Sequence, residues 1–440
     1  MKRAIVVLYC LMMVSVCRAD WQKQFDELIK TDSPEKQQQL IDSIVASGAS
    51  VDQIVARIRS ISFDKKSRPD DGIVINKSRC LDGKKRPWAL HIPATYDFHT
   101  PTPLLVVLHG GVSRPYIMKD PHKHALEHYF TKLSEEHGWF TLFPSGEAHA
   151  EWWDSVGMGN ISNLIREVKR EYNIDDDRVW IAGFSDGGSG AFVQAMTDGT
   201  DFAAFVTLNC HIAVGSLAGK LYNYPGNMAN RPVYAVTNDQ DRLYPTAKME
   251  PLITMALAAG ADITYRKRTG GHDLSYGEFE LPIIAGFLES HPRNLAPDSI
   301  IWESAEGPFG RYLWIAIDSV ANDFPKPWHT DYNIEMVWQG GASTDTSLLF
   351  IRNKPSAKII AKKEGNTIYI KESRLKTLSV FLDVDLFDFS KPLDISVNGK
   401  EVYNKSVSPD ISYLLHDFLN NRDRKLLNAG QITVNLGDRF

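Results

Sequence analysis

Residues 178–193 read RVWIAGFSDGGSGAFV, and Ser185 lies at the centre of a Gly-x-Ser-x-Gly pattern within them. The apolar run before the pattern predicts a short buried strand, and the small residues after it predict a helix. Gly183 and Gly187 lack the side chains that would clash where a strand turns sharply into a helix. Such a nucleophile elbow lifts the Ser185 hydroxyl out of the sheet and places the Asp186 backbone N–H at a helix N-terminus. The alternative is a glycine-rich turn with an idle serine.

Two further residues are required downstream, because a serine hydroxyl becomes a good nucleophile only when a histidine takes its proton and an acid orients that histidine. The strand-like run at 231–237 is followed by Asp239 and Asp241, and the next strand-like run is followed by His272 on a glycine-rich loop. The carboxyl ends of parallel strands meet at one edge of a sheet, so these side chains can reach Ser185. Both aspartates stay candidates at this point, because sequence determines loop register poorly.

Four stretches carry a resemblance to a known family. They are the run RPWALHIP at 86–93, the run LLVVLHGG at 104–111, the elbow at Ser185 and the loop that carries His272. Through them, residues from about 85 to 292 resemble α/β-hydrolases of the secreted esterase kind. The stretch is similar to polyhydroxybutyrate depolymerase-like, feruloyl and acetyl-xylan esterases and to prolyl-oligopeptidase-type catalytic domains. The chain order serine, aspartate, histidine also matches that of the α/β-hydrolases.

This resemblance implies a serine hydrolase that needs no cofactor. Ser185 would attack an ester carbonyl and form an acyl-enzyme, while His272 would take and return the proton. Asp241 would hold the imidazole, and it is favoured over Asp239 because Asp-x-x-Tyr-Pro resembles the family's Asp-x-x-Val-Pro after the same strand.

Backbone N–H groups are expected to form the oxyanion hole. The N–H of Asp186 is the first candidate donor, and the N–H of Gly111 is the second, with Val112 as an open alternative to Gly111. His109 precedes the Gly110-Gly111 pair and is expected to shape this loop rather than to transfer protons.

The substrate is less well defined, because loops rather than the fold select it. Trp152 and Trp153 could form an aromatic wall for a small-molecule ester or an ester linked to a polysaccharide, or could instead pack under the elbow. Peptide hydrolysis is an alternative, although the chain shows no sign of the propeller such peptidases carry. A further alternative is polysaccharide binding by the C-terminal part through Trp314, Trp328 and Trp338.

The N-terminus indicates export. Residues 1–19 have a basic start, an apolar run and a small residue at Ala19, which is typical of a cleavable secretory leader, and lipid attachment at Cys17 is the alternative. Cleavage would change the formal net charge from −5 to −8. An acidic chain without a basic cluster gives no reason to expect nucleic acid as a partner. No later apolar run approaches the roughly 20 residues of a membrane span, so a secreted or periplasmic protein is expected.

The remaining histidines and cysteines suggest no metal site. Cys80 and Cys210 are expected to be two buried thiols, although an exported protein could pair them. His91 lies in a predicted strand, and the chain contains neither a HExxH helix nor a CxxC pair. Solvent-exposed histidines are expected in the polar helical stretch that contains His122, His124, His128 and His137.

The pattern along the chain predicts four parts: a leader at 1–19, a helical segment at 20–75, a catalytic domain at 76–292 and a β-rich domain at 293–440. Alternating strand-like and helix-like runs in the third part predict an α/β fold, a doubly wound, mostly parallel sheet with helices on both faces. The fourth part has short strand-like runs, a hairpin signal at Asn398-Gly399 and one helix-like insert, which together predict a β-sandwich.

Overall fold

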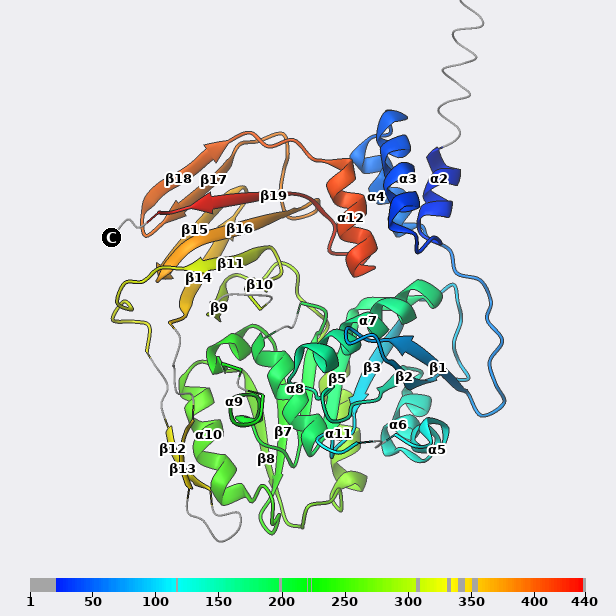
Figure 1. The fold of residues 1–440 in the computed structure, drawn as a ribbon, viewed down its shortest axis with the longest axis vertical. Helices are drawn as coiled ribbons and strands as arrows, with labels where there is room; N and C mark the ends of the chain where they lie inside the picture. The colour runs from blue at the N-terminus through cyan, green and yellow to red at the C-terminus, as the bar shows by residue number, and fades with distance from the viewer. Residues whose placement is uncertain are drawn as a thin grey trace, which may run out of the picture.

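The computed structural model describes residues 21–115, 118–197, 200–219, 221–222, 224–305, 309–330, 334–338, 345–349 and 355–437, the strands at 334–338 and 345–349 without their side chains. The predicted leader therefore lies outside the described residues. Figure 1 shows the large α/β sheet at the bottom, a β-sandwich above it and a group of N-terminal helices beside the sandwich. Among the described helices, none combines the length and the apolar character that crossing a bilayer requires.

The large sheet has eight strands in the order β1-β2-β4-β3-β5-β6-β7-β8, and it confirms the predicted α/β fold. The first two strands run antiparallel to their neighbours, and the other six are parallel. It begins at Ile73, three residues before the predicted boundary. The strands are β1 (Ile73–Arg79), β2 (Lys85–His91), β3 (Thr102–Leu108), β4 (Phe140–Pro144), β5 (Ile174–Phe184), β6 (Ala204–Leu208), β7 (Val233–Asn238) and β8 (Ile263–Arg268).

Helices cover both faces because the central strands are apolar on both faces. In β3, Leu104 and Val106 face one hydrophobic core with α7, α8 and α10, whereas Leu105 and Val107 face a second core with α5, α6 and α11. The helical elements are α5 (Pro121–Glu127), α6 (Tyr129–His137), α7 (Ser155–Glu171), α8 (Asp186–Thr197), α9 (Val214–Leu217), the 3-10 helix η1 (Pro225–Asn230), α10 (Thr246–Ala258) and α11 (Gly277–Ser290).

One predicted helix is in fact two. The sequence indicates a continuous helix through 125–136, but the backbone of His128 is extended and separates α5 from α6. The break is stabilised locally, because the His128 ring accepts the Phe130 backbone N–H at 3.2 Å as an N-cap.

The N-terminal segment forms α2 (Trp21–Leu28), α3 (Pro34–Ala46) and α4 (Val51–Arg59). A serine side chain caps each of the last two helices at its N-terminus, and Ser50 forms a reciprocal capping box with Gln53. The apolar faces of all three helices pack on α12 (Ile411–Asn421) in one core. The N-terminal helices therefore pack beside the sandwich on α12, a helix from the C-terminal part of the chain (Figure 1).

The C-terminal strands form two facing sheets, β10-β11-β16-β19 and β18-β17-β15-β14-β9, around one core. Asn398 and Gly399 both have positive φ and join β17 to β18 in the predicted two-residue hairpin. Leu313, whose φ is 49°, lies between β10 and β11 and separates the two short strands. The strands are β9 (Ile300–Ser304), β10 (Arg311–Tyr312), β11 (Ile315–Val320), β14 (Ala357–Glu364), β15 (Thr367–Ser373), β16 (Leu375–Asp383), β17 (Leu393–Val397), β18 (Lys400–Lys405) and β19 (Asn428–Asn435), with a separate pair β12 (Ile334–Trp338) and β13 (Asp345–Leu349).

Candidate active site

The predicted strand–turn–helix forms around Ser185. Strand β5 ends at Phe184, Ser185 adopts φ 57°, and α8 begins at the next residue. Neither flanking glycine could be replaced by a residue with a Cβ without a steric clash. A Cβ on Gly183 would lie 2.1 Å from the Gly187 carbonyl carbon, and a Cβ on Gly187 would lie 1.9 Å from the Leu108 oxygen. The left-handed turn therefore holds the Ser185 side chain at the carboxyl edge of the sheet.

The structure brings Ser185, Asp241 and His272 together. The His272 Nε2 atom lies 2.9 Å from the Ser185 Oγ, and its Nδ1 lies 2.8 Å from the Asp241 Oδ2. A carboxylate only accepts hydrogen bonds, so Nδ1 carries the proton and Nε2 is free to accept the serine hydroxyl hydrogen. This arrangement can deprotonate Ser185 when its oxygen attacks an electrophile.

Asp241 is a buried carboxylate that accepts several hydrogen bonds from the surrounding protein. Its Oδ1 accepts the backbone N–H groups of Leu243 and Tyr244 at 2.8 and 2.9 Å, and its Oδ2 also accepts the Asn209 amide at 3.2 Å. Burial alone would raise the pKa of Asp241, but the hydrogen bonds from Tyr244, His272, Leu243 and Asn209 outweigh it and leave that pKa below its usual value. Asp241 therefore stays ionised beside His272 at neutral pH.

Asp239, the alternative acid, bonds to the backbone of the loop that carries His272. It is exposed, and its Oδ1 accepts the Gly270 backbone N–H at 3.2 Å, which tethers the loop that carries His272. The geometry therefore selects Asp241 as the partner of the imidazole.

These observations, together with the strand order, decide the fold family. The fold is that of the α/β-hydrolases. The eight-stranded sheet, the elbow after β5 and the acid and histidine after β7 and β8 occur in its characteristic order. We refer to residues 73–290 as the hydrolase domain.

No protein-family model matches the chain. It is 29% identical over 119 residues to the bifunctional acetylxylan esterase/xylanase XynS20E of Neocallimastix patriciarum, a match that covers 26% of this chain and 17% of that protein. The chain thus spans only about a sixth of the length of this curated relative.

Solved structures with a similar fold include esterases and a peptidase. A thermostable esterase is 19% identical with a TM-score of 0.40, covering 51% of this chain and 64% of its own. A ferulic acid esterase is 16% identical with a TM-score of 0.40, covering 49% and 97%. The Pyrococcus horikoshii acylaminoacyl peptidase is 14% identical with a TM-score of 0.41, covering 50% and 42%.

The loop after β3 packs directly against the elbow. A Cβ on Gly110 would lie 3.1 Å from the Ser185 Cβ, and Gly111 has φ 72°. The Val112 backbone N–H already donates to the Asp186 Oδ2 at 2.9 Å. Of the two alternatives for the second oxyanion donor, this contact disfavours Val112 and favours Gly111.

His109 anchors this loop as an uncharged ring. Its Nε2 accepts the Gly146 backbone N–H at 3.0 Å, so Nδ1 carries the hydrogen and donates to the Gly110 carbonyl at 2.9 Å. Burial lowers the pKa of His109 to about 4. The Trp152 indole N–H donates to the His109 carbonyl at 2.8 Å, which secures the loop from below.

The predicted substrate wall of Trp152 and Trp153 is wrong. Both side chains lie in the core, with exposed fractions of 0% and 2%, and a Cβ on Gly190 of α8 would lie 2.4 Å from the Trp152 Cβ. Trp152 packs beneath the elbow against α8, whereas Trp153 packs against Gly219, which follows α9. Of the sandwich tryptophans, Trp314 is core, Trp328 is partly exposed, and the Trp338 side chain lies outside the described residues.

Sequence reasoning missed two residues behind the triad. Asn209 follows β6 with φ 45°, and its amide donates to Asp241 and, at 3.3 Å, to the Gly271 carbonyl. The Tyr276 hydroxyl donates to the Asn209 Oδ1 at 2.6 Å. The position of Asn209 at the carboxyl end of a strand could have indicated it, whereas no sequence signal points to Tyr276.

Among the other titratable groups, His124 differs from expectation. His124 is not solvated: its ring contacts those of His109 and His128, with centroids 6.1 and 5.2 Å apart. Cys80 and Cys210 are both free and buried. Among the described residues, no cluster of three or more histidine, cysteine or acidic side chains has metal-binding geometry.

Weak acid should destabilise the protein. Burial lowers the pKa of His109 and His211 from 6.5 to about 4 and that of His128 to about 3, so between about pH 4 and 6.5 these three side chains bind three more protons in the unfolded chain than in the native state. Asp383 opposes this by one proton, because burial raises its pKa from 3.8 to about 6. The stability provided by the histidines is complete above pH 6.5 and is lost toward pH 4, at a net cost for these four groups of about 2.7 kcal/mol per pH unit. Urea unfolding at pH 7.5 and at pH 5 measures this loss of stability. Equal free energies of unfolding at the two pH values would contradict the prediction.

Proposed function

We propose that this protein is a serine hydrolase that cleaves carboxylic esters through an acyl-enzyme. The observation that carries the proposal is the pair of hydrogen bonds at 2.9 and 2.8 Å that link Ser185, His272 and Asp241. Ser185 Oγ attacks the carbonyl carbon while His272 Nε2 takes its proton, and His272 then protonates the departing alcohol. Water attacks the acyl-enzyme by the same route in reverse and releases the acid.

The backbone N–H groups of Gly111 and Asp186 are proposed to bind the oxyanion. Asp186 follows Ser185 on the first turn of α8, where the helix dipole favours negative charge, and Gly111 follows Gly110, which packs against Ser185 on the loop after β3. Each such donor typically contributes about 3 kcal/mol to lowering the barrier. No step of this mechanism calls for a cofactor.

The proposed natural substrate is an ester on a polysaccharide, and the proposed location is outside the cytoplasm. The similarity to a protein named acetylxylan esterase/xylanase supports the substrate class. The leader-like residues 1–19 support export.

Active-site labelling tests the proposal. A fluorophosphonate probe should modify one residue of the intact protein, and peptide mapping should place it in the peptide that contains Ser185. Short-chain nitrophenyl esters should be hydrolysed and prolyl-peptide anilides should not. Labelling elsewhere, or turnover of the anilides without the esters, would overturn the assignment.

Asp186 is predicted to position the oxyanion loop through its side chain. Replacing it by alanine removes the acceptor for the Val112 N–H. The loop would then shift relative to Ser185, and kcat should fall about 10- to 100-fold with little change in KM, because misplacing a catalytic donor by about 1 Å costs this much. Asp186→Asn retains an acceptor oxygen and should recover most of the activity. An alanine variant with normal kcat would contradict this role.

A further inference from the structure

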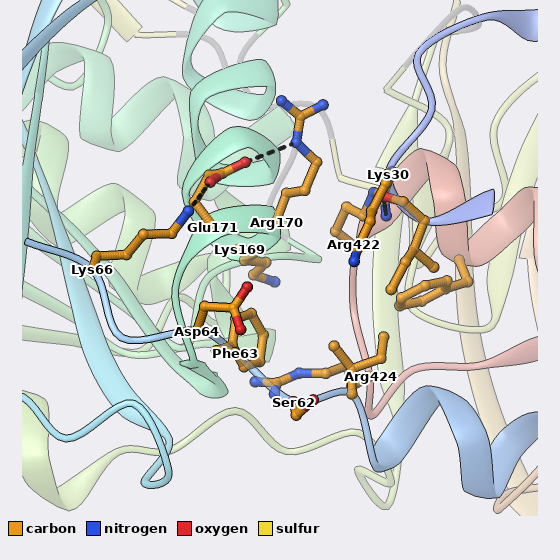
Figure 2. A pocket seen from close by; sticks show the side chains of 13 residues that line it. Lys30, Ser62, Phe63, Asp64, Lys66, Lys169, Arg170, Glu171, Arg422 and Arg424 are labelled. Carbon is orange, nitrogen blue, oxygen red and sulfur yellow. Dashed lines mark hydrogen bonds and ion pairs between the residues drawn. The ribbon is translucent and has the colours of Figure 1, made fainter. Parts of the chain in front are cut away.

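A cavity of about 290 Å³ lies where the N-terminal helices, the hydrolase domain and α12 meet (Figure 2). It borders the C-terminal end of α7, just before β5 begins, whereas Ser185 follows the other end of that strand. At about 3.3 Å per residue, β5 separates the two places by roughly 30 Å. The cavity is therefore distinct from the proposed active site.

Six cationic side chains line this cavity, against only two acidic ones. The acids are Asp64 and Glu171. The cations come from all three parts of the chain, and they are Lys30, Lys66, Lys169, Arg170, Arg422 and Arg424.

The cations at the floor of the cavity are neutralised. Lys169 Nζ lies 3.0 Å from one oxygen of Asp176, and Arg424 Nε lies 3.1 Å from the other. Asp423, beside them, accepts Arg293 at 2.6 Å. These buried ion pairs link the hydrolase domain to the C-terminal domain, and their charges are already compensated without a ligand.

Two cations of the wall are also paired. Lys66 lies 2.6 Å from Glu171, and Arg170 lies 2.6 Å from Asp32 and 3.4 Å from Glu171. The pairs to Glu171 are visible in Figure 2.

Lys30 and Arg422 differ from these four. Arg422 donates to the Ile29 carbonyl at 3.1 Å, but among the described side chains no carboxylate lies within ion-pair distance of Arg422 or Lys30. Both residues line the cavity and are labelled in Figure 2, and the carbonyl that accepts Arg422 belongs to the residue directly before Lys30. Burial and the nearby Arg170 lower the pKa of Arg422 to about 10 against the opposing charge of Asp32, so the group is still charged at neutral pH. Its guanidinium lies 5.8 Å from the centre of the Phe418 ring, and Asp32 forms its ion pair with Arg170 instead.

The cavity is larger than a bare inorganic ion requires, and part of its lining is apolar. Phe63 and Phe418 line it together with Ile29 and Ile61. Its volume is close to the lower end of the range for small-molecule sites, about 300 Å³. That space suits an anionic group carried on a ring-sized organic body.

We propose that this cavity is a binding site for a compact organic oxyanion, a carboxylate or phosphate on a body the size of one sugar ring, held between Lys30 and Arg422. Such a ligand would bridge the N-terminal helices and α12 above the end of α7. Because it would bind only the assembled chain, it would stabilise the fold by mass action. The proposal does not depend on the proposed hydrolase activity.

Matched sugars test this proposal on the intact protein. Glucuronate and glucose 6-phosphate carry an oxyanion on the same ring as neutral glucose. Both anions should raise Tm saturably, by about 2 °C or more, and should give binding heat, whereas glucose should do neither. Inorganic phosphate, which lacks the ring, should bind at least about tenfold more weakly.

Charge-removing variants locate the site. Lys30→Gln and Arg422→Gln should each weaken glucuronate binding about tenfold or more, whereas Lys65→Gln, an exposed lysine outside the lining, should leave it unchanged. Arg422→Gln also loses the contact to Ile29, so the exposed Lys30 provides the decisive variant. The proposal is overturned if glucose matches the anions, if phosphate matches the sugars, if no anion binds, or if Lys65→Gln weakens binding as much as Lys30→Gln.

Discussion

Replacing Ser185 by alanine should lower kcat for a nitrophenyl ester by about 10⁶-fold, the loss expected when a triad nucleophile is removed. The variant keeps the oxyanion loop and the hydrogen bond between His272 and Asp241, so any residual rate would come from binding and electrostatic stabilisation. Its Tm should stay within about 2 °C of the original, because only one hydroxyl is lost.

The controls for this experiment are another serine and a double variant. Ser275→Ala changes an exposed serine on the loop after His272 and should retain full activity. Ser185→Ala combined with His272→Ala should be no slower than the single variant, because the two residues act as a unit. A Ser185→Ala protein that keeps more than about 1% of the activity would show that another nucleophile operates.

Replacing Asp241 by asparagine should lower kcat about 10⁴-fold at neutral pH. The reason lies in the two backbone N–H groups, of Leu243 and Tyr244, that both bond to Oδ1. The amide oxygen of asparagine must occupy that position, so the amide NH₂ faces His272 Nδ1. The imidazole would then carry its hydrogen on Nε2, facing Ser185, and could not act as a base.

Asp239→Asn is the matched control, because it makes the same chemical change two residues away on the same loop. It weakens only the contact to the Gly270 N–H and should cost less than about tenfold in kcat. The comparison of kcat at pH 7 for the two variants decides between the candidate acids. A larger loss in Asp239→Asn than in Asp241→Asn would reverse the assignment that the geometry supports.

Local sequence patterns account for much of the site. The Gly183 position is explained locally, because a Cβ there would lie 2.1 Å from the Gly187 carbonyl carbon four residues ahead, whereas Gly187 is required by the Leu108 oxygen of the neighbouring strand β3. Ser33 and Ser50 mark helix starts for a similarly local reason, since their side chains bond to N–H groups three residues ahead.

Burial of individual side chains was harder to predict. Trp152 and His124 lie in loop-like or polar stretches, and their surroundings come from elements far along the chain, such as α8 and the loop after β3. Asn209 and Tyr276 support Asp241 from two different elements, and neither belongs to a recognisable motif.

The amino-acid order alone therefore specified the α/β alternation, the elbow and the order of the three triad residues, because these depend on periodicity and on steric demands within a few residues. Folding in three dimensions decided which aspartate meets His272, and it buried the tryptophans. It also placed α12 against the N-terminal helices around a cationic cavity. Those outcomes depend on contacts between residues distant in the chain, whose burial and charge pairing no short window of sequence contains.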